Sequence, residues 1–212
     1  MKLKIVFVFL AGFLFFSCTS LNRQNSPKQE TSGEADVLGL QYLVYVTNRH
    51  KVPLLLPCDM NGTVETYQTM EGSYGNQYFS MLLYFFSDQN EMQLSLLNDF
   101  GTDMGSLFYD GREVRFESAM FPKNLKAEYI VCDIQNAYYD SAALEANYKN
   151  AGLIFETERI LNETGGTEEI RRIFDEKKLV EEIMLKNGRE VQSITIRNYL
   201  RGYEYKLTKV EE

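Results

Sequence analysis

The sequence predicts a mainly β domain built on one strongly curved antiparallel sheet, with two helices inserted near the middle of the chain. Three observations predict this fold class: Asn-Gly and Asp-Gly pairs that mark hairpin turns, segments in which apolar and polar residues alternate, and one interval where apolar residues return at helical spacing. Abundant Tyr and Phe, 14 of each, also favour strands. We expect a sheet of about nine to eleven strands, which is large enough to curl.

Asn-Gly and Asp-Gly pairs indicate two-residue hairpin turns, because both central positions of a type I′ turn need a positive φ. The chain has three such pairs, Asn61-Gly62, Asp110-Gly111 and Asn187-Gly188. Strand-like sequence flanks each pair on at least one side, as in residues 113–117, where apolar and charged residues alternate. The pairs therefore predict a meander of antiparallel strands.

Further strands are marked by alternation or by nearly continuous apolar sequence. Residues 77–87 are almost all apolar and residues 92–96 alternate, with Gln89-Asn90 as the expected turn between them. The C-terminal residues 203–208 alternate as well, which is typical of a half-buried closing strand. Strands are also expected at 106–109, 178–186 and 191–198.

Two stretches break the strand period. Apolar residues between Leu125 and Asn136 recur at roughly helical spacing, after the start signals Pro122 and Asn124. A second short helix is expected at 141–148, where Asp140 or Ser141 could cap and alanines have high helix propensity. Residues 167–174 fit either a helical turn or a solvent-facing strand, and we favour the strand.

A curved sheet leaves a concave apolar face that must be covered, and the inserted helices are the expected cover. If they fill the concavity, the same apolar residues simply make a core; if they cover it loosely, those residues line an apolar pocket. The candidate lining residues lie on one side of their strands: Leu94, Leu96, Val114, Phe116, Leu153, Phe155, Ile183, Leu185, Tyr203 and Tyr205.

The N-terminus predicts an exported lipoprotein. Two lysines precede an apolar run at residues 5–16, which as a helix would rise about 18 Å, short of the roughly 30 Å hydrocarbon core of a bilayer. Ser17 then precedes Cys18, the arrangement that lipoprotein signal peptidase accepts. We expect residues 1–17 to be a signal peptide, Cys18 to carry lipid, 18–36 to be a polar tether and 37–212 to be one domain. The alternative is a short anchor in which Cys18 is an incidental thiol.

The charge of the chain limits its partners. The formal net charge is −8, and removal of residues 1–17 takes away Lys2 and Lys4, which leaves about −10. Nucleic acid is therefore not an expected partner. The same charge argues against the domain itself lying on an anionic membrane.

Few residues are available for catalysis or metal binding. His50 is the single histidine, and no Cys-x-x-Cys or Cys/His spacing occurs, so we expect no metal, no cofactor and no enzymatic activity. Asp59 to Gly62 only loosely resembles a calcium loop and is read as a turn. Acidic clusters, namely Asp99 with Asp103, Glu168-Glu169 and Glu181-Glu182, are assigned to turns and solvated strand faces. Cys58 and Cys132 either form a disulfide or remain free thiols.

Several runs, in this order, resemble the uncharacterised bacterial lipoprotein family known as domain of unknown function 3261 over residues 60–209. They are Gly105–Gly111, Tyr129–Tyr139, Gly188-Arg189 with Ile194, and Gly202–Leu207. One departure is Tyr139-Asp140, where the family has a Trp-Pro pair. That family is similar to the LolA and LolB lipoprotein carriers, which implies an unclosed β-barrel with a helical lid over a cavity that takes acyl chains.

Two functions follow as hypotheses. The first is a lipid-anchored envelope lipoprotein that binds or carries a hydrophobic ligand, either lipid or the acyl chains of another lipoprotein. The second is a non-enzymatic binding or structural module of the envelope with a filled core. Thr19, rather than Asp, follows Cys18, which under enterobacterial sorting directs a lipoprotein to the outer membrane, facing the periplasm. The sequence assigns no oligomeric state.

Overall fold

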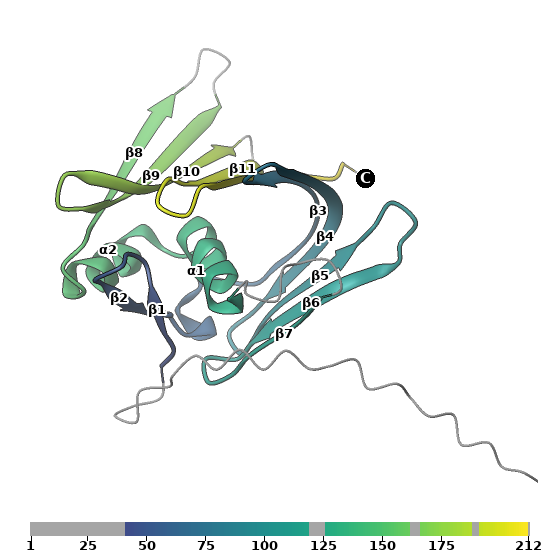
Figure 1. Ribbon diagram of the computed structural model, residues 1–212, viewed down its shortest axis with the longest axis horizontal. Coiled ribbons are helices and arrows are strands. Elements are labelled where there is room, and N and C mark those ends of the chain that lie inside the picture. Colours follow the sequence, from purple (N-terminus) through teal and green to yellow (C-terminus); the bar gives the residue numbers. More distant parts are fainter. Residues whose placement is uncertain (1–40, 119–125, 162–165, 188–190, 212) are drawn as a thin grey trace, which may run out of the picture.

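The computed structural model describes residues 41–118, 126–161, 166–187 and 191–211 (Figure 1). The predicted signal peptide, Cys18 and the predicted tether lie outside the described residues. In chain order the elements are β1 (Leu43–Tyr45), β2 (Lys51–Pro53), η1 (Pro57–Asp59), β3 (Val64–Tyr74), β4 (Gln77–Ser87), β5 (Met92–Leu97), β6 (Asp103–Tyr109), β7 (Val114–Ser118), α1 (Ala127–Tyr138), α2 (Ser141–Asn150), β8 (Ile154–Leu161), β9 (Thr167–Asp175), β10 (Lys178–Asn187), β11 (Val191–Asn198) and β12 (Tyr203–Lys209).

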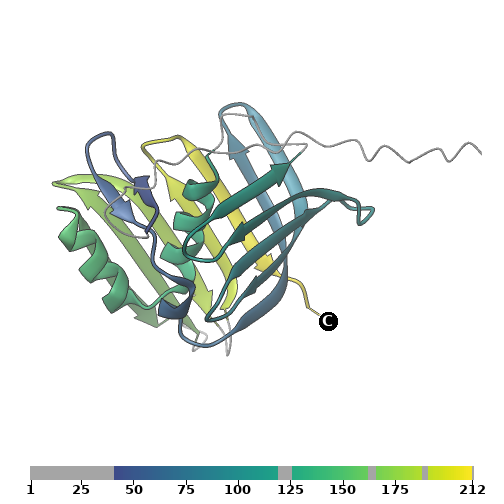
Figure 2. The same cartoon turned by 90° about the horizontal axis from the view of Figure 1, so that it is seen from below.

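Ten strands form one antiparallel sheet in the order β7-β6-β5-β4-β3-β12-β11-β10-β9-β8. Its two edges, β7 and β8, do not pair with each other, so the sheet curls without closing into a barrel. Figure 1 shows α1 in the hollow of this curved sheet, with α2 beside β8. The view from below in Figure 2 shows the same strands wrapped around α1. The predicted fold class, mainly β with inserted helices and an unclosed sheet, is confirmed.

The C-terminal strand joins the two halves of the sheet. β12 lies between β3 and β11, pairing Leu207 with Met70 on one side and with Ile194 on the other. Strands β3 to β7 form one meander and β8 to β11 form another, so β12 makes the sheet continuous. A separate two-stranded sheet, β1 with β2, was not predicted; it contacts both helices.

The hairpin predictions have different outcomes. Asp110-Gly111 lies in the loop between β6 and β7, where Gly111 has φ +90° and the Asp110 side chain accepts hydrogen bonds from the backbone of Arg112 and Glu113. Asn61-Gly62 does not join paired strands, because β2 pairs with β1 while β3 pairs with β4 and β12; that prediction was wrong. The turn at Asn187-Gly188 reaches residues outside the described ranges, although β10 and β11 do pair.

The two helices form close to where the sequence placed them. α1 begins two residues later than predicted and ends at Tyr138. α2 is capped by Asp140, whose carboxylate accepts hydrogen bonds from the backbone of Ala142 and Ala143 at 2.9 and 3.2 Å. The aspartate therefore marks the start of α2. The ambiguous segment 167–174 is strand β9, as favoured.

Candidate functional site

A small apolar cavity lies between α1 and the inner face of the sheet. Its volume is about 30 Å³, room for roughly one or two water molecules. Strand alternation places one residue in two on this face, and the helix contributes two isoleucines four residues apart, which therefore share one side of α1. The lining residues are Met70, Leu83, Leu94, Leu96, Leu107, Phe116, Ile130, Ile134, Tyr205 and Leu207.

Four of the residues proposed from the sequence line this cavity: Leu94, Leu96, Phe116 and Tyr205. The other six lie elsewhere. Val114, Ile183 and Leu185 are buried in their strands away from the cavity. Tyr203 is half-buried and its hydroxyl donates to Asp133. Leu153 directly precedes β8, and Phe155, the second residue of β8, stacks on Tyr148 of α2 at 5.5 Å between ring centroids.

Sequence reasoning missed most of the remaining lining. Met70 sits in a strand whose other residues are largely polar, so alternation did not mark it. Leu83 belongs to a run so apolar that neither face stands out. Ile130 and Ile134 carried a usable signal, since their spacing of four places them together on any helix.

A buried polar cluster adjoins the cavity and was also missed. The Asp133 carboxylate accepts hydrogen bonds from the Tyr203 hydroxyl at 2.7 and 2.9 Å and from the Tyr205 hydroxyl at 3.1 Å. The Glu181 carboxylate accepts one from the Asn136 amide at 3.0 Å and one from the Asn198 amide at 2.8 Å. Tyr205 therefore contributes to both the apolar cavity and the polar cluster.

Both carboxyl groups of the cluster are nearly inaccessible to solvent. Asp133 is 4 % exposed and Glu181 is 3 % exposed. Burial raises the pKa of Asp133 well above its ordinary value, and the charge of Glu181 raises it further, while hydrogen bonds from Tyr203 and Tyr205 and the charge of Arg201 act against the rise. Burial also raises the pKa of Glu181, against the hydrogen bonds from Asn136 and Asn198. The pair thus holds protons more tightly than exposed carboxyl groups do.

The assignment of the acidic pairs to solvated strand faces was wrong for Glu181 and for Glu169, which is 6 % exposed. The Arg171 guanidinium binds the Glu169 carboxylate at 2.7 Å. It also donates to the carbonyl oxygens of Asn136 and Tyr139, both at 2.8 Å, at the end of α1. A buried ion pair therefore serves to satisfy the carbonyls that a helix C-terminus leaves open.

The sequence model of the family described as "Protein of unknown function (DUF3261)" matches residues 65–211. The chain belongs to this family. The resemblance predicted from the sequence runs is thereby confirmed. No curated protein matches this DUF3261 chain.

Solved structures with some similarity to the DUF3261 chain include two bacterial proteins. One is a DUF1329 family protein from Desulfovibrio piger, with 11 % identity, a TM-score of 0.36, and coverage of 73 % of this chain and 86 % of the other. The second is a putative outer membrane lipoprotein-sorting protein domain from Vibrio parahaemolyticus, with 9 % identity, a TM-score of 0.29, and coverage of 71 % and 84 %. Both TM-scores are low, and the fold described above stands on this chain's own elements.

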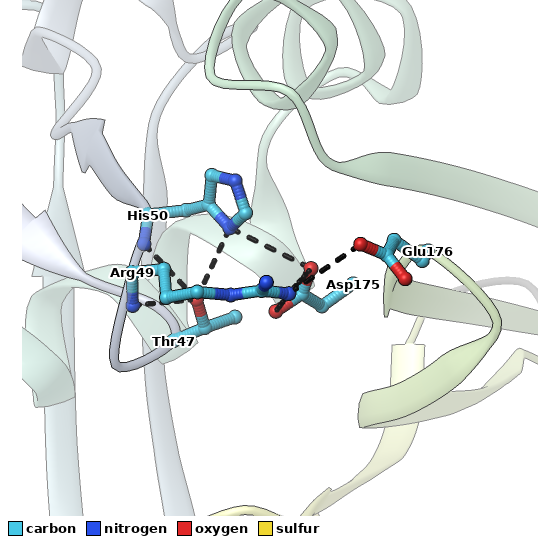
Figure 3. A network of polar contacts seen from close by, with 5 residues as sticks. All are labelled: Thr47, Arg49, His50, Asp175 and Glu176. Atoms are coloured by element: carbon cyan, nitrogen blue, oxygen red, sulfur yellow. Dashed lines mark hydrogen bonds and ion pairs between the residues drawn. The ribbon is translucent and has the colours of Figure 1, made fainter.

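The DUF3261 chain has a second polar network around His50, shown in Figure 3. His50 Nδ1 lies 3.2 Å from the Thr47 hydroxyl and 3.6 Å from the Asp175 carboxylate, and Arg49 binds Asp175 at 3.1 Å and Glu176 at 3.6 Å. In a catalytic triad, hydroxyl and carboxylate occupy opposite ring nitrogens of the histidine. Here they share one nitrogen, so the network does not relay a proton; it fastens the β1–β2 loop to the β9–β10 turn.

Cys58 and Cys132 are both free, which settles the open alternative for this pair of cysteines; Cys58 is exposed and Cys132 is buried. Burial raises the pKa of the Cys132 thiol, and the charges of Glu181 and Asp133 raise it further, so the thiol stays protonated.

Within the described ranges, no three His, Cys, Asp or Glu side chains are grouped to hold a metal ion. Among the same residues, no helix is long and apolar enough to cross a membrane.

Proposed function

We propose that this DUF3261 chain is a lipid-anchored lipoprotein of the cell envelope that binds the alkyl chain of a hydrophobic ligand beneath α1. The observation that carries the proposal is the cavity, which is lined by nine apolar side chains and one tyrosine. Protein interiors are normally close-packed, and an apolar cavity stays dry and takes up apolar molecules. A gap between a helix and a sheet is therefore a natural entry point for an acyl chain.

The cavity as it stands is smaller than one acyl chain. An engineered apolar cavity of about 150 Å³ holds benzene, several times the volume found here. Ligand binding therefore requires the wall to move. Two lining residues, Met70 and Ile130, are only half-buried, so both can shift outward, and methionine adapts easily to new shapes.

The ligand class and location follow from the predicted anchor. Cys18 would hold the domain at a membrane, within reach of lipids and of other lipoproteins, whose acyl chains are the proposed cargo. We place the chain at the outer membrane, facing the periplasm, on the strength of Thr19 after Cys18. The proposed role is binding or carrying rather than catalysis.

The small volume of the cavity favours a second candidate function, an envelope binding or structural module with a filled core. Native mass spectrometry of protein purified without detergent separates the two. The carrier function requires a co-purifying lipid or uptake of an added fatty acid at about one per chain. A clean apo mass that an excess of oleic acid leaves unchanged would favour the filled core.

Matched variants sharpen this test. Leu107→Trp adds bulk to the cavity wall from β6, whereas Leu153→Trp adds the same bulk at a buried position between α2 and β8 that does not line the cavity. We expect the first change to lower fatty-acid occupancy and the second to leave it unchanged in whatever fraction remains folded. Equal occupancy in both variants would place the ligand outside the cavity.

A further inference from the structure

Helix α1 contacts the sheet in two different ways. On one side, Ile130 and Ile134 border the apolar cavity, where packing is incomplete. On another side, Asp133 and Asn136 are one turn apart and hydrogen-bond to polar groups of β10 and β12. β11 joins this network through Asn198, which donates to Glu181. The hydrogen bonds of Asp133 and Asn136 therefore fasten the polar side of α1 to β10 and β12.

Titratable and charged groups lie around this attachment on several elements. On β9, Arg171 donates to the Asn136 carbonyl and pairs with Glu169, so these two residues add no net charge. Glu181 comes from β10, Arg201 from the β11–β12 turn, Tyr203 and Tyr205 from β12, and Tyr148 from α2, with Cys132 on α1 itself. Burial raises the pKa of each of the three tyrosines and of Cys132, so these four groups stay neutral at moderate pH.

Two acids therefore face one cation. Arg201 lies with its guanidinium carbon 4.0 Å from the centre of the Tyr129 ring and donates to the carbonyls of Tyr45 and Val46, and its charge favours ionisation of both acids. With one proton retained by the acid pair, the charges of the cluster balance. With none retained, one negative charge stays buried without compensation, which is costly in a low-dielectric interior.

We propose that α1 is a proton-sensitive latch over the cavity: it stays seated on β10 to β12 while Asp133 and Glu181 together keep one proton, and it lifts when that proton is lost to solvent. Lifting admits water to the carboxylates and uncovers Ile130 and Ile134. That the uncovered cavity then receives a ligand rests on the proposed function; the latch itself does not.

Local lifting is favoured over unfolding of the sheet. The strands are held by continuous backbone hydrogen bonds, whereas α1 is attached to β10–β12 through side chains. Local openings draw on the least tightly held elements. Since the folded-state pKa values of the two acids are raised, the stabilising effect of the retained proton is fully present below the ordinary carboxyl range, near pH 4, and is lost as pH rises through the folded-state values.

Hydrogen–deuterium exchange on the full chain in a nonionic detergent tests the latch without any ligand. Protection factors, corrected for the intrinsic pH dependence of exchange, are measured for residues 127–138 and for β10–β12 between pH 5 and 8.5. We expect protection of α1 to fall at least tenfold over this range while the strands change less than threefold. A constant protection of α1, or a parallel loss in helix and strands, would overturn the proposal.

The double change Asp133→Asn with Glu181→Gln removes both titratable carboxyl groups while keeping the shapes of the side chains. We expect α1 protection in this variant to vary less than threefold with pH. Glu182→Gln is the matched control, because it makes the same change on the outward face of β10, where Glu182 pairs with Arg172 at 2.8 Å; it should keep the tenfold fall. A tenfold fall in the double variant would overturn the proposal, and the wild-type titration decides the matter if that variant does not fold.

The latch and the proposed function can fail separately. If α1 loosens with rising pH but oleic acid never binds, the latch stands and the carrier function fails. If oleic acid binds while α1 protection is independent of pH, the carrier function stands and the latch fails.

Discussion

Replacing Phe116 with alanine distinguishes a cavity wall from a filled core. Phe116 is 3 % exposed and lines the cavity. Phe155, 6 % exposed, is the matched control, because its ring stacks on the fully buried Tyr148 away from the cavity. Both changes remove the same atoms from buried positions. A difference between the two losses in the free energy of unfolding therefore reports how well the surrounding residues move into the vacated space.

The expected magnitudes follow from burial and volume. A Phe-to-Ala change opens roughly 100 Å³, which at ~24 cal/mol per Å³ costs about 2.4 kcal/mol if nothing relaxes, in addition to roughly 2 kcal/mol for lost burial. Phe155→Ala should therefore lower the free energy of unfolding by about 4 kcal/mol. For Phe116→Ala we expect about 2 kcal/mol, because the half-buried Met70 and Ile130 border the enlarged space and can move into it.

Urea denaturation gives the stability changes, and displacement of a fluorescent fatty acid gives the affinity. Phe116→Ala should alter fatty-acid affinity several-fold, whereas Phe155→Ala should leave the affinity of the folded fraction unchanged. The reasoning is refuted if both variants lose about 4 kcal/mol and the parent protein binds no fatty acid. That result would identify the space beneath α1 as an ordinary packing defect in a solid core.

Three further predictions concern the anchor and the local structure. Cys18→Ser should abolish metabolic labelling by a clickable fatty acid and leave an unprocessed precursor on a gel; normal labelling would contradict the predicted lipoprotein. Asp140→Ala should lower stability by about 1 kcal/mol, since α2 loses a cap that binds two backbone amides; Ser141→Ala, which removes no cap contact, is the comparison in the same denaturation assay. Gly72→Ala should cost roughly 1–3 kcal/mol, because a methyl group there would lie 2.6 Å from Tyr205 Cβ and 2.7 Å from the Glu204 carbonyl oxygen; an unchanged melting temperature would show that β3 and β12 can move apart.

Local patterns predicted the strands and helices well because local spacing decides them. Alternation in residues 92–96 and 113–117 is a property of the strand alone, and both segments are strands with the apolar residues buried. The helical spacing near 125–136 likewise needs no partner. The hairpin predicted at Asn61-Gly62 was wrong because a hairpin also depends on strand pairing, which is not a local property. Gly62 has the positive φ of a turn glycine, +86°, but the strands on its two sides, β2 and β3, do not pair with each other.

The candidate site was only partly predictable, because its polar half depends on distant partners. Glu181 looks solvent-facing in a sequence, since a carboxylate is rarely buried without compensation. It is buried because Asn136 and Asn198, remote in sequence, supply amide hydrogen bonds. The placement of β12 between β3 and β11 is equally invisible to local patterns, and it is this placement that brings Tyr205 to both the cavity and Asp133.

The central position of β12 also bears on how the chain reaches its folded state. Residues 64–74 emerge from the ribosome early, yet their second neighbour in the sheet is formed by residues 203–209. Contacts between such distant segments carry a large loop-closure cost and form slowly. The continuous sheet is therefore out of reach until nearly the whole chain has been synthesised.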